Sequence, residues 1–157
     1  MIMDSNLEFA DAVSVAAAAG TALIGDVIDL GATPDDISAG TPMYLVINVD
    51  TEIITGGAAG TLTFKLASDA QAAIATDGTA TVHVATTGFV TDGTDANAAE
   101  MKAGAYPLIV ALPGGVPYER FLGILAVTAT TTTTAGAINA FLTTDVARWK
   151  AYADASN

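Results

Sequence analysis

The sequence predicts an all-β protein, an antiparallel β-sandwich of jelly-roll type with about eight strands and one to three short helical turns. Two observations lead to this prediction. Apolar and polar residues alternate with a period of two over much of the chain, and clusters of glycine, proline and aspartate separate the alternating segments. The helical turns are too short to form a layer, so two sheets have to cover each other, commonly as a jelly roll.

The first half of the chain contains five predicted strands. Residues 43–50 show the clearest alternation, and residues 61–66 and 81–84 repeat it. Residues 23–30 give a weaker strand that an aspartate interrupts, and residues 8–15 are predicted to form an additional edge strand. The apolar faces of these strands are expected to carry Ile24, Ile28 and Leu30, then Met43, Leu45, Ile47 and Val49, then Leu62, Phe64 and Leu66, and finally Val82 and Val84.

The second half adds three strands, at residues 108–112, 121–129 and 137–143. The strand at 121–129 is apolar on both faces, which predicts burial on both sides, either in the middle of a sheet or at a subunit contact. The threonine-rich stretch 128–134 is predicted to continue this strand near Thr128 and to form an exposed loop beyond it. The expected apolar faces carry Leu108, Val110 and Leu112, Leu122 and Ile124 opposite Phe121, Leu125 and Val127, and Ile138, Ala140 and Leu142.

Turn residues separate the predicted strands. The segments 31–42 and 113–115 are rich in glycine and proline, and Asp77-Gly78 and Asp92-Gly93 are typical turn dipeptides. The glycine-rich segment 56–60 lacks the Lys-Ser/Thr pair of a phosphate-binding loop, so we interpret it as a hairpin loop.

Three short helical turns fit between or after the strands. Residues 69–74 follow a candidate cap at Ser68 or Asp69, and residues 96–103 are rich in helix formers. Residues 146–155 are predicted as a short C-terminal helix or an arm. The whole chain, 1–157, suits one domain, with residues 1–20 and 144–157 as candidate arms.

The charge balance excludes several classes of partner. The chain has 17 acidic and 5 basic residues, a formal net charge of −12, so we expect no binding to nucleic acid or to anionic membranes. Charged residues make up 14% of the chain, against about 25% in typical soluble domains, which favours burial of part of the surface against other chains. The apolar segment 13–20 follows acidic rather than basic residues, so we expect no secretory signal.

The inventory of reactive side chains predicts a protein that is not an enzyme. There is no cysteine, and the one histidine, His83, lies in the middle of a predicted strand, where a polar-face or interface position is expected. The serines show no G-x-S-x-G elbow, so a serine triad is not predicted. An acid-pair hydrolase on a jelly roll stays open as an alternative, because counting carboxylates neither selects nor excludes a pair.

No cofactor or metal site is predicted. Asp92, Asp95 and Glu100 form the one loop worth weighing for calcium, with Asp35-Asp36 as a poorer one. Neither loop fits the twelve-residue EF-hand pattern. Acidic loops that contain glycine are commonly solvated turns, and that is our interpretation of both.

The strongest candidates for an interaction surface are aromatic and arginine side chains near the C-terminus, the residue types that dominate interface hot spots. Two interpretations of the tail stay open: Trp149 contacts another chain, or it folds back and fills one end of the sandwich. A carbohydrate-binding or adhesion module is a further alternative, with Tyr44 and Trp149 as sugar platforms. The candidate interface residues are Tyr118, Arg120, Phe121, Arg148, Trp149 and Tyr152.

Four segments of the chain, 41–50, 60–74, 77–86 and 112–155, resemble the capsid cement (decoration) proteins of tailed phages, of the Bordetella-phage type. The resemblance lies in the order of the motifs F-x-L-x-S-D-A, D-G-T-x-T-V-H and Y-E-R-F-L-G, followed by a late A-F-L-T strand. It covers nearly the whole chain, and residues 87–105 match less clearly.

The resemblance implies a jelly-roll sandwich without catalytic activity or cofactor. It implies a virion protein on the outer capsid surface that is synthesised in the cytoplasm of a host bacterium. Its partners would be the major capsid protein, over whose junctions it binds, and a second copy of itself, as a homodimer in preference to a homotrimer. The candidate interface residues would then contact the other copy or the capsid.

Overall fold

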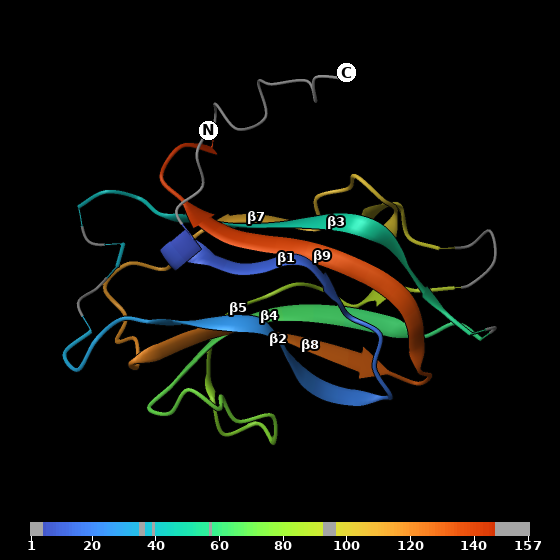
Figure 1. Cartoon of the computed structure of the whole chain (residues 1–157), viewed down its shortest axis with the longest axis horizontal. Coiled ribbons are helices and arrows are strands. Elements are labelled where there is room, and N and C mark those ends of the chain that lie inside the picture. The colour runs from blue at the N-terminus through green and yellow to red at the C-terminus, as the bar shows by residue number, and fades with distance from the viewer. Residues whose placement is uncertain (1–4, 35–36, 39, 57, 93–96, 147–157) are drawn as a thin grey trace.

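The computed structural model describes residues 5–34, 37–38, 40–56, 58–92 and 97–146. In these residues, nine strands form two antiparallel sheets that lie face to face, as the two layers of Figure 1 show. The elements are η1 (Ser5–Leu7), β1 (Glu8–Ser14), β2 (Gly20–Asp29), β3 (Tyr44–Thr55), β4 (Thr61–Asp69), β5 (Thr81–Ala85), β6 (Phe89–Val90), η2 (Ala99–Met101), β7 (Leu108–Ala111), β8 (Phe121–Ala129) and β9 (Thr133–Thr143).

The strand order confirms the predicted jelly roll. One sheet has the order β1-β9-β3-β7, and the other has the order β2-β8-β4-β5, with β6 pairing with β4 beside β5. Strand pairs are therefore nested: β1 pairs with β9, β2 with β8, β3 with β7, and β4 with β5. This is the pattern of one long hairpin wrapped over two sheets. The edge strand predicted at residues 8–15 is β1.

The inner faces of the two sheets form one hydrophobic core, and the period-two prediction is confirmed there. Burial of one large apolar side chain stabilises a fold by about 1.5–3 kcal/mol, so this core is the main favourable term. Predicted core residues that are 0% exposed are Leu45, Ile47 and Val49 of β3, Leu62, Phe64 and Leu66 of β4, Leu122 and Ile124 of β8, and Ile138 and Ala140 of β9.

Strand β8 is a central strand and is buried on both faces, as predicted. The core between the sheets covers its inner face. Its outer-face residue Leu125 packs with Ala67 and Ile74 in a second, smaller cluster. Ile74 belongs to the loop 70–80, which lies against the outside of the five-stranded sheet (Figure 1). A Cβ on Gly123 would lie 2.6 Å from Cδ1 of Ile74, so any larger residue there would push this side chain aside. The chain thus covers the second face of β8 itself.

The helical turn predicted at 69–74 is wrong. The segment forms bends, and Asp69 organises them as a loop. Its carboxylate accepts hydrogen bonds from the N–H groups of Gln71 (3.1 Å) and Ala75 (3.0 Å). These backbone N–H groups hold the pKa of Asp69 below its usual value. The second N–H is too far along the chain for a helix cap, so the loop closes over the sheet instead.

Other local predictions are corrected by the topology. The glycine-rich segment at 56–60 is not a hairpin loop, because it joins β3 in one sheet to β4 in the other. The predicted exposed loop beyond Thr128 is short: β9 already begins at Thr133, which is 1% exposed. The helical turn predicted at 96–103 is present only as one 3-10 turn, η2. The C-terminal helix or arm predicted at 146–155 falls almost wholly outside the described residues.

The alternation predicted for β5 is also wrong in part. Val84 pairs with Leu66 and Val82 pairs with Ala67, so His83 is an extra residue at a β-bulge. Val84 packs against the core, whereas Val82 is 46% exposed. A bulge places neighbouring residues on similar sides of a strand, which is why the two valines do not share a face.

Substitution of Gly25 by alanine should destabilise the fold strongly. The loss of unfolding free energy should exceed the loss at a glycine that also has positive φ but has open space around it. Gly25 has φ +67°, and a Cβ there would lie 2.0 Å from the carbonyl oxygen of Phe9 on β1. We expect Gly25→Ala to lower the unfolding free energy by more than about 3 kcal/mol, from backbone strain and the steric clash together. Denaturant titration measures the change.

Gly78→Ala is the matched control for this experiment. Gly78 has φ +97°, and a Cβ added there would meet nothing within 4 Å, so the variant carries the strain without the clash. We expect a loss of about 1–2 kcal/mol for this variant. Equal losses for the two variants would contradict the close crossing of β1 over β2.

Candidate interaction surface

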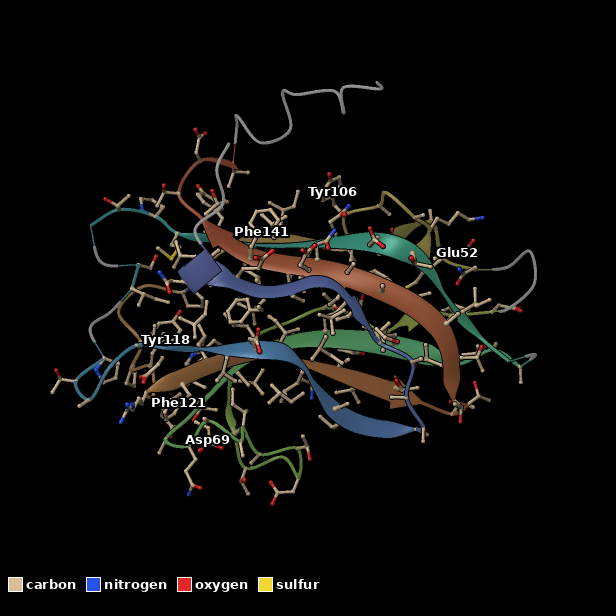
Figure 2. All side chains as sticks on the ribbon, in the orientation of Figure 1. Glu52, Asp69, Tyr106, Tyr118, Phe121 and Phe141 are labelled. Carbon is tan, nitrogen blue, oxygen red and sulfur yellow. The ribbon has the colours of Figure 1, made fainter. Side chains whose placement is uncertain are left out.

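Tyr118, a predicted interface residue, is buried inside this chain. Its side chain is 5% exposed, and its hydroxyl donates a hydrogen bond to the carbonyl oxygen of Pro113 (2.7 Å). Its ring stacks on His83, with 4.2 Å between the ring centroids and an angle of 29° between the planes. Figure 2 places Tyr118 at one end of the sandwich, the end at which Phe121 also lies. Tyr118 therefore fixes the connection between β7 and β8.

A hydrogen-bonded chain joins three elements beside Tyr118. The backbone N–H of Glu119 donates to Oγ of Ser68 (3.1 Å), and Oγ of Ser68 lies 2.7 Å from Nε2 of His83. Because Ser68 accepts one hydrogen bond, its own hydroxyl proton is available for the imidazole. The hydroxyl can donate to an unprotonated Nε2 or accept from a protonated one, so the tautomer of the ring sets the direction of this hydrogen bond.

The electrostatics agree with a neutral His83. Burial lowers the pKa of His83 below its usual value, and the carboxylate of Glu119 opposes this shift more weakly. Glu119 is itself held in place, since the hydroxyl of Thr81 donates to its Oε1 (2.7 Å). The connection between β7 and β8 is thus tied to both β4 and β5.

This Ser–His pair was not predicted, and the bulge explains why. The two residues stand on neighbouring strands, and a regular strand would place His83 on the face away from Ser68. The pair resembles part of a hydrolytic dyad, but Ser68 is 0% exposed, so its hydroxyl has no access to a substrate. We therefore interpret the pair as a structural tie.

Arg120 is exposed and held in one orientation. Its Nε and Nη2 donate to the two carboxylate oxygens of Asp29, at 2.8 and 2.7 Å, and its guanidinium carbon lies 4.8 Å from the ring centroid of Phe121. The arginine contact and the N–H of Gly31 lower the pKa of Asp29 to about 2. The side chains of Asp29, Arg120 and Phe121 thus form a contiguous surface patch where β8 begins. We call it the Arg120 patch.

The remaining interface candidates lie in the C-terminal segment 147–157. Arg148, Trp149 and Tyr152 lie outside the described residues, so their role stays a prediction. Of the proposed sugar platforms, Tyr44 is half-buried at the start of β3, where it pairs with Ala111 of β7.

The candidate calcium loop is described only in part. Asp95 and its neighbours 93–96 lie outside the described residues. Among the residues that are described, no group of three histidine, cysteine or acidic side chains is placed to hold a metal ion. The amide of Asn97 instead donates to Oε1 of Glu52 (3.0 Å) and to the carbonyl oxygen of Ile53 (3.1 Å), which ties the loop to β3.

Comparison with known proteins gives one decisive match. A protein-family model described as Bbp16 matches residues 9–142, from β1 through almost all of β9. The chain belongs to the Bbp16 family. The name of this family indicates a protein of a Bordetella phage, in agreement with the resemblance seen in the sequence. No curated protein matches the chain.

The matched range contains nearly the whole sandwich of this Bbp16 protein. It includes the Ser68–His83 tie, the Arg120 patch and the loop 70–80 that covers β8. In the described part of the chain, no helix is long and apolar enough to cross a membrane.

The unfolding free energy of this Bbp16-family sandwich should decrease as the pH is lowered from about 7 to 5, because its one histidine resists protonation in the folded chain. The unfolded chain takes up a proton at His83 near pH 6.5, and the folded chain does so only at lower pH. The unfolding free energy is therefore highest above pH 6.5 and declines below it. The carboxyl groups with lowered pKa, such as Asp29, lose their contribution only near and below about pH 4.

His83→Gln is the matched variant, because its amide can still accept from Ser68 but does not titrate. Denaturant titrations at several pH values should show a flatter profile for this variant between pH 5 and 7. A natural chain whose unfolding free energy is constant over that interval would contradict a neutral, half-buried His83.

Proposed function

We propose that this protein is a non-enzymatic cement (decoration) protein that binds the outer capsid surface of a tailed phage, between major capsid proteins, and stabilises the mature head. The observation that carries the proposal is the match to the Bbp16 family over residues 9–142. The match covers nearly the entire sandwich, so the proposal concerns the whole fold rather than one motif. The sequence resemblance to cement proteins supports the same function.

The physical character of the sandwich suits this role. A jelly roll with nested strand pairs has a single core and few free edges, so it resists local opening. Its 14% charged residues leave much of the surface uncharged, and such a surface favours contact with other chains. The buried Ser68 supports a role without catalysis, because the Ser–His pair of the chain has no access to a substrate.

Cementing would work by thermodynamic linkage. A ligand that binds only the mature lattice stabilises it by RT ln(1 + [L]/Kd), about 4 kcal/mol per site at a thousand-fold excess over Kd. Many sites on one head add their contributions, so a modest affinity per site is sufficient. We propose that the protein binds as a homodimer, because two linked copies that engage the lattice together bind more tightly than one.

Binding to heads is the direct test. Purified protein should sediment with phage heads that have been stripped of it, saturably with expanded heads and not with unexpanded heads. Refilled heads should release their DNA at a higher temperature than stripped heads. Absence of binding to either form of head would overturn the proposed function and leave the fold unaffected.

The Arg120 patch gives a residue-level prediction. Arg120→Ala should weaken binding to expanded heads by about tenfold, as expected for an interface arginine. The thermal midpoint of the isolated chain should change little, because the ion pair with Asp29 is exposed and solvent screens it.

Lys102→Ala is the charge-matched control, because Lys102 is an exposed base next to η2, on a different segment from this patch. We expect its binding to equal that of the natural protein. Unchanged binding for Arg120→Ala would remove the Arg120 patch from the interface without affecting the wider proposal.

A further inference from the structure

The five-stranded sheet ends in two short strands, β5 and β6. The N–H of Ala98 donates to the carbonyl oxygen of Val90 on β6 (3.0 Å), whereas no described segment outside β4 makes such a backbone hydrogen bond to β5. Strand β5 is the last strand of this sheet, and β6 continues the same side of β4. The N–H of Thr86 donates inward, to the carbonyl oxygen of Phe64 on β4 (2.9 Å). Backbone groups alternate in direction along a strand, so the N–H and C=O of Ala85 point away from the sheet. In this β5–β6 edge, residues 81–90, it is therefore the β5 part, residues 81–85, that offers hydrogen-bonding groups to a further strand.

The β5–β6 edge lacks the usual protection of an edge strand. Natural edges commonly carry lysine, proline or other charged residues that prevent pairing with another chain. From Gly78 to Thr91 the sequence contains no charged residue and no proline. Val82 and Val90 in this segment are 46% and 40% exposed, so the edge is also apolar. Its irregularities are the bulge at His83 and the break at residues 86–88 between β5 and β6.

The remaining edges of the sandwich are less suited to pairing. Strand β7, at the edge of the four-stranded sheet, has only 4 residues. Strands β1 and β2, at the opposite side, pack against each other where the chain turns from one sheet to the other. Residues 81–85 of the β5–β6 edge thus stay open to pairing, whereas β1 and β2 face each other.

The charges around this edge indicate what it binds. Asp77 precedes β5, Glu119 contacts Thr81 at its start, and Asp92 follows β6. An antiparallel second copy aligned over the uncharged stretch would bring Asp77 of one chain close to Asp92 of the other. Like charges opposed in this way destabilise a strand pair, and each chain carries a formal net charge of −12. A chain with basic residues fits better than a second copy.

We propose that the β5–β6 edge takes up an extended segment of a different protein chain, which adds a strand to the five-stranded sheet. The segment would carry apolar side chains at alternate positions and lysine or arginine at its ends. Main-chain hydrogen bonds supply affinity in such strand addition, and the flanking side chains supply specificity. This inference rests on the proposed function, because the capsid lattice would supply the segment.

The test places a proline at Ala85, whose N–H points away from β4. Ala85→Pro removes an N–H that does not pair with β4, so the sandwich keeps its own hydrogen bonds while the edge loses one for a new strand. We expect its thermal midpoint to stay near that of the natural chain, and its binding to expanded heads to weaken by about tenfold or more. Ala85→Ser, which keeps the N–H, is the matched control and should bind like the natural protein.

A second measurement keeps the inference testable if the proline variant does not fold. Hydrogen exchange of the natural protein, free and bound to heads, should show new protection of the amides at 81–85. Natural protein that binds heads without this protection, or full binding by folded Ala85→Pro, would overturn strand addition and leave the cement function standing. Failure of the natural protein to bind heads would overturn both.

Discussion

The constraint on which this structure depends is that each sheet has one apolar face that has to leave water. Neither sheet is stable alone, because a half-apolar sheet exposes its whole inner face. The nested strand pairs meet this constraint in two steps. Hydrogen bonds between strands from the two ends of the chain form each sheet, and the apolar faces of the two sheets then cover each other. Pairing of β1 with β9 completes the arrangement, since it joins the first strand to the last.

Close packing in turn dictates where small residues stand. Gly136 on β9 has φ +129°, and a Cβ there would lie 2.6 Å from Cγ1 of Ile53 on the neighbouring strand β3. Gly123 on β8 leaves room for Ile74, which covers the outside of the same sheet. In both places a side chain of one segment occupies the space that a Cβ of another would need. These glycines therefore allow the dense packing that large interior side chains require.

The irregular strands carry the features that distinguish this sandwich from a generic jelly roll. The bulge in β5 turns His83 toward Ser68 and so ties the β7–β8 connection to the sheet. The same bulge leaves Val82 exposed on the edge that we propose as a docking site. The buried tie and the open edge lie on opposite sides of one short strand. Binding at the edge would thus act on a strand whose inner side is already fixed by hydrogen bonds and stacking.

The sequence by itself determined the fold class and most of the core of this protein. Period-two alternation placed Leu45, Phe64 and Ile138 correctly, because an inward side chain at every second position is a local property of a strand. Residue type also singled out Arg120 and Phe121 as interface candidates, and the structure brings these two side chains into contact. The family resemblance added the prediction of a phage cement protein. The match to Bbp16 supports the coarser part of this prediction, that the chain is a phage protein.

Only the tertiary structure decided the strand order, the Ser68–His83 tie and the burial of Tyr118. The order depends on which strands meet after the chain has wrapped, and alternation is the same for every order. The tie depends on one extra residue in β5, which shifts His83 to the other face and which no pattern along the chain reveals. Tyr118 has the character of an interface aromatic in sequence, yet a stacked ring and a carbonyl acceptor from its own chain bury it. The Ser68–His83 and His83–Tyr118 contacts join different segments of the chain, so their geometry exists only once the sheets have formed.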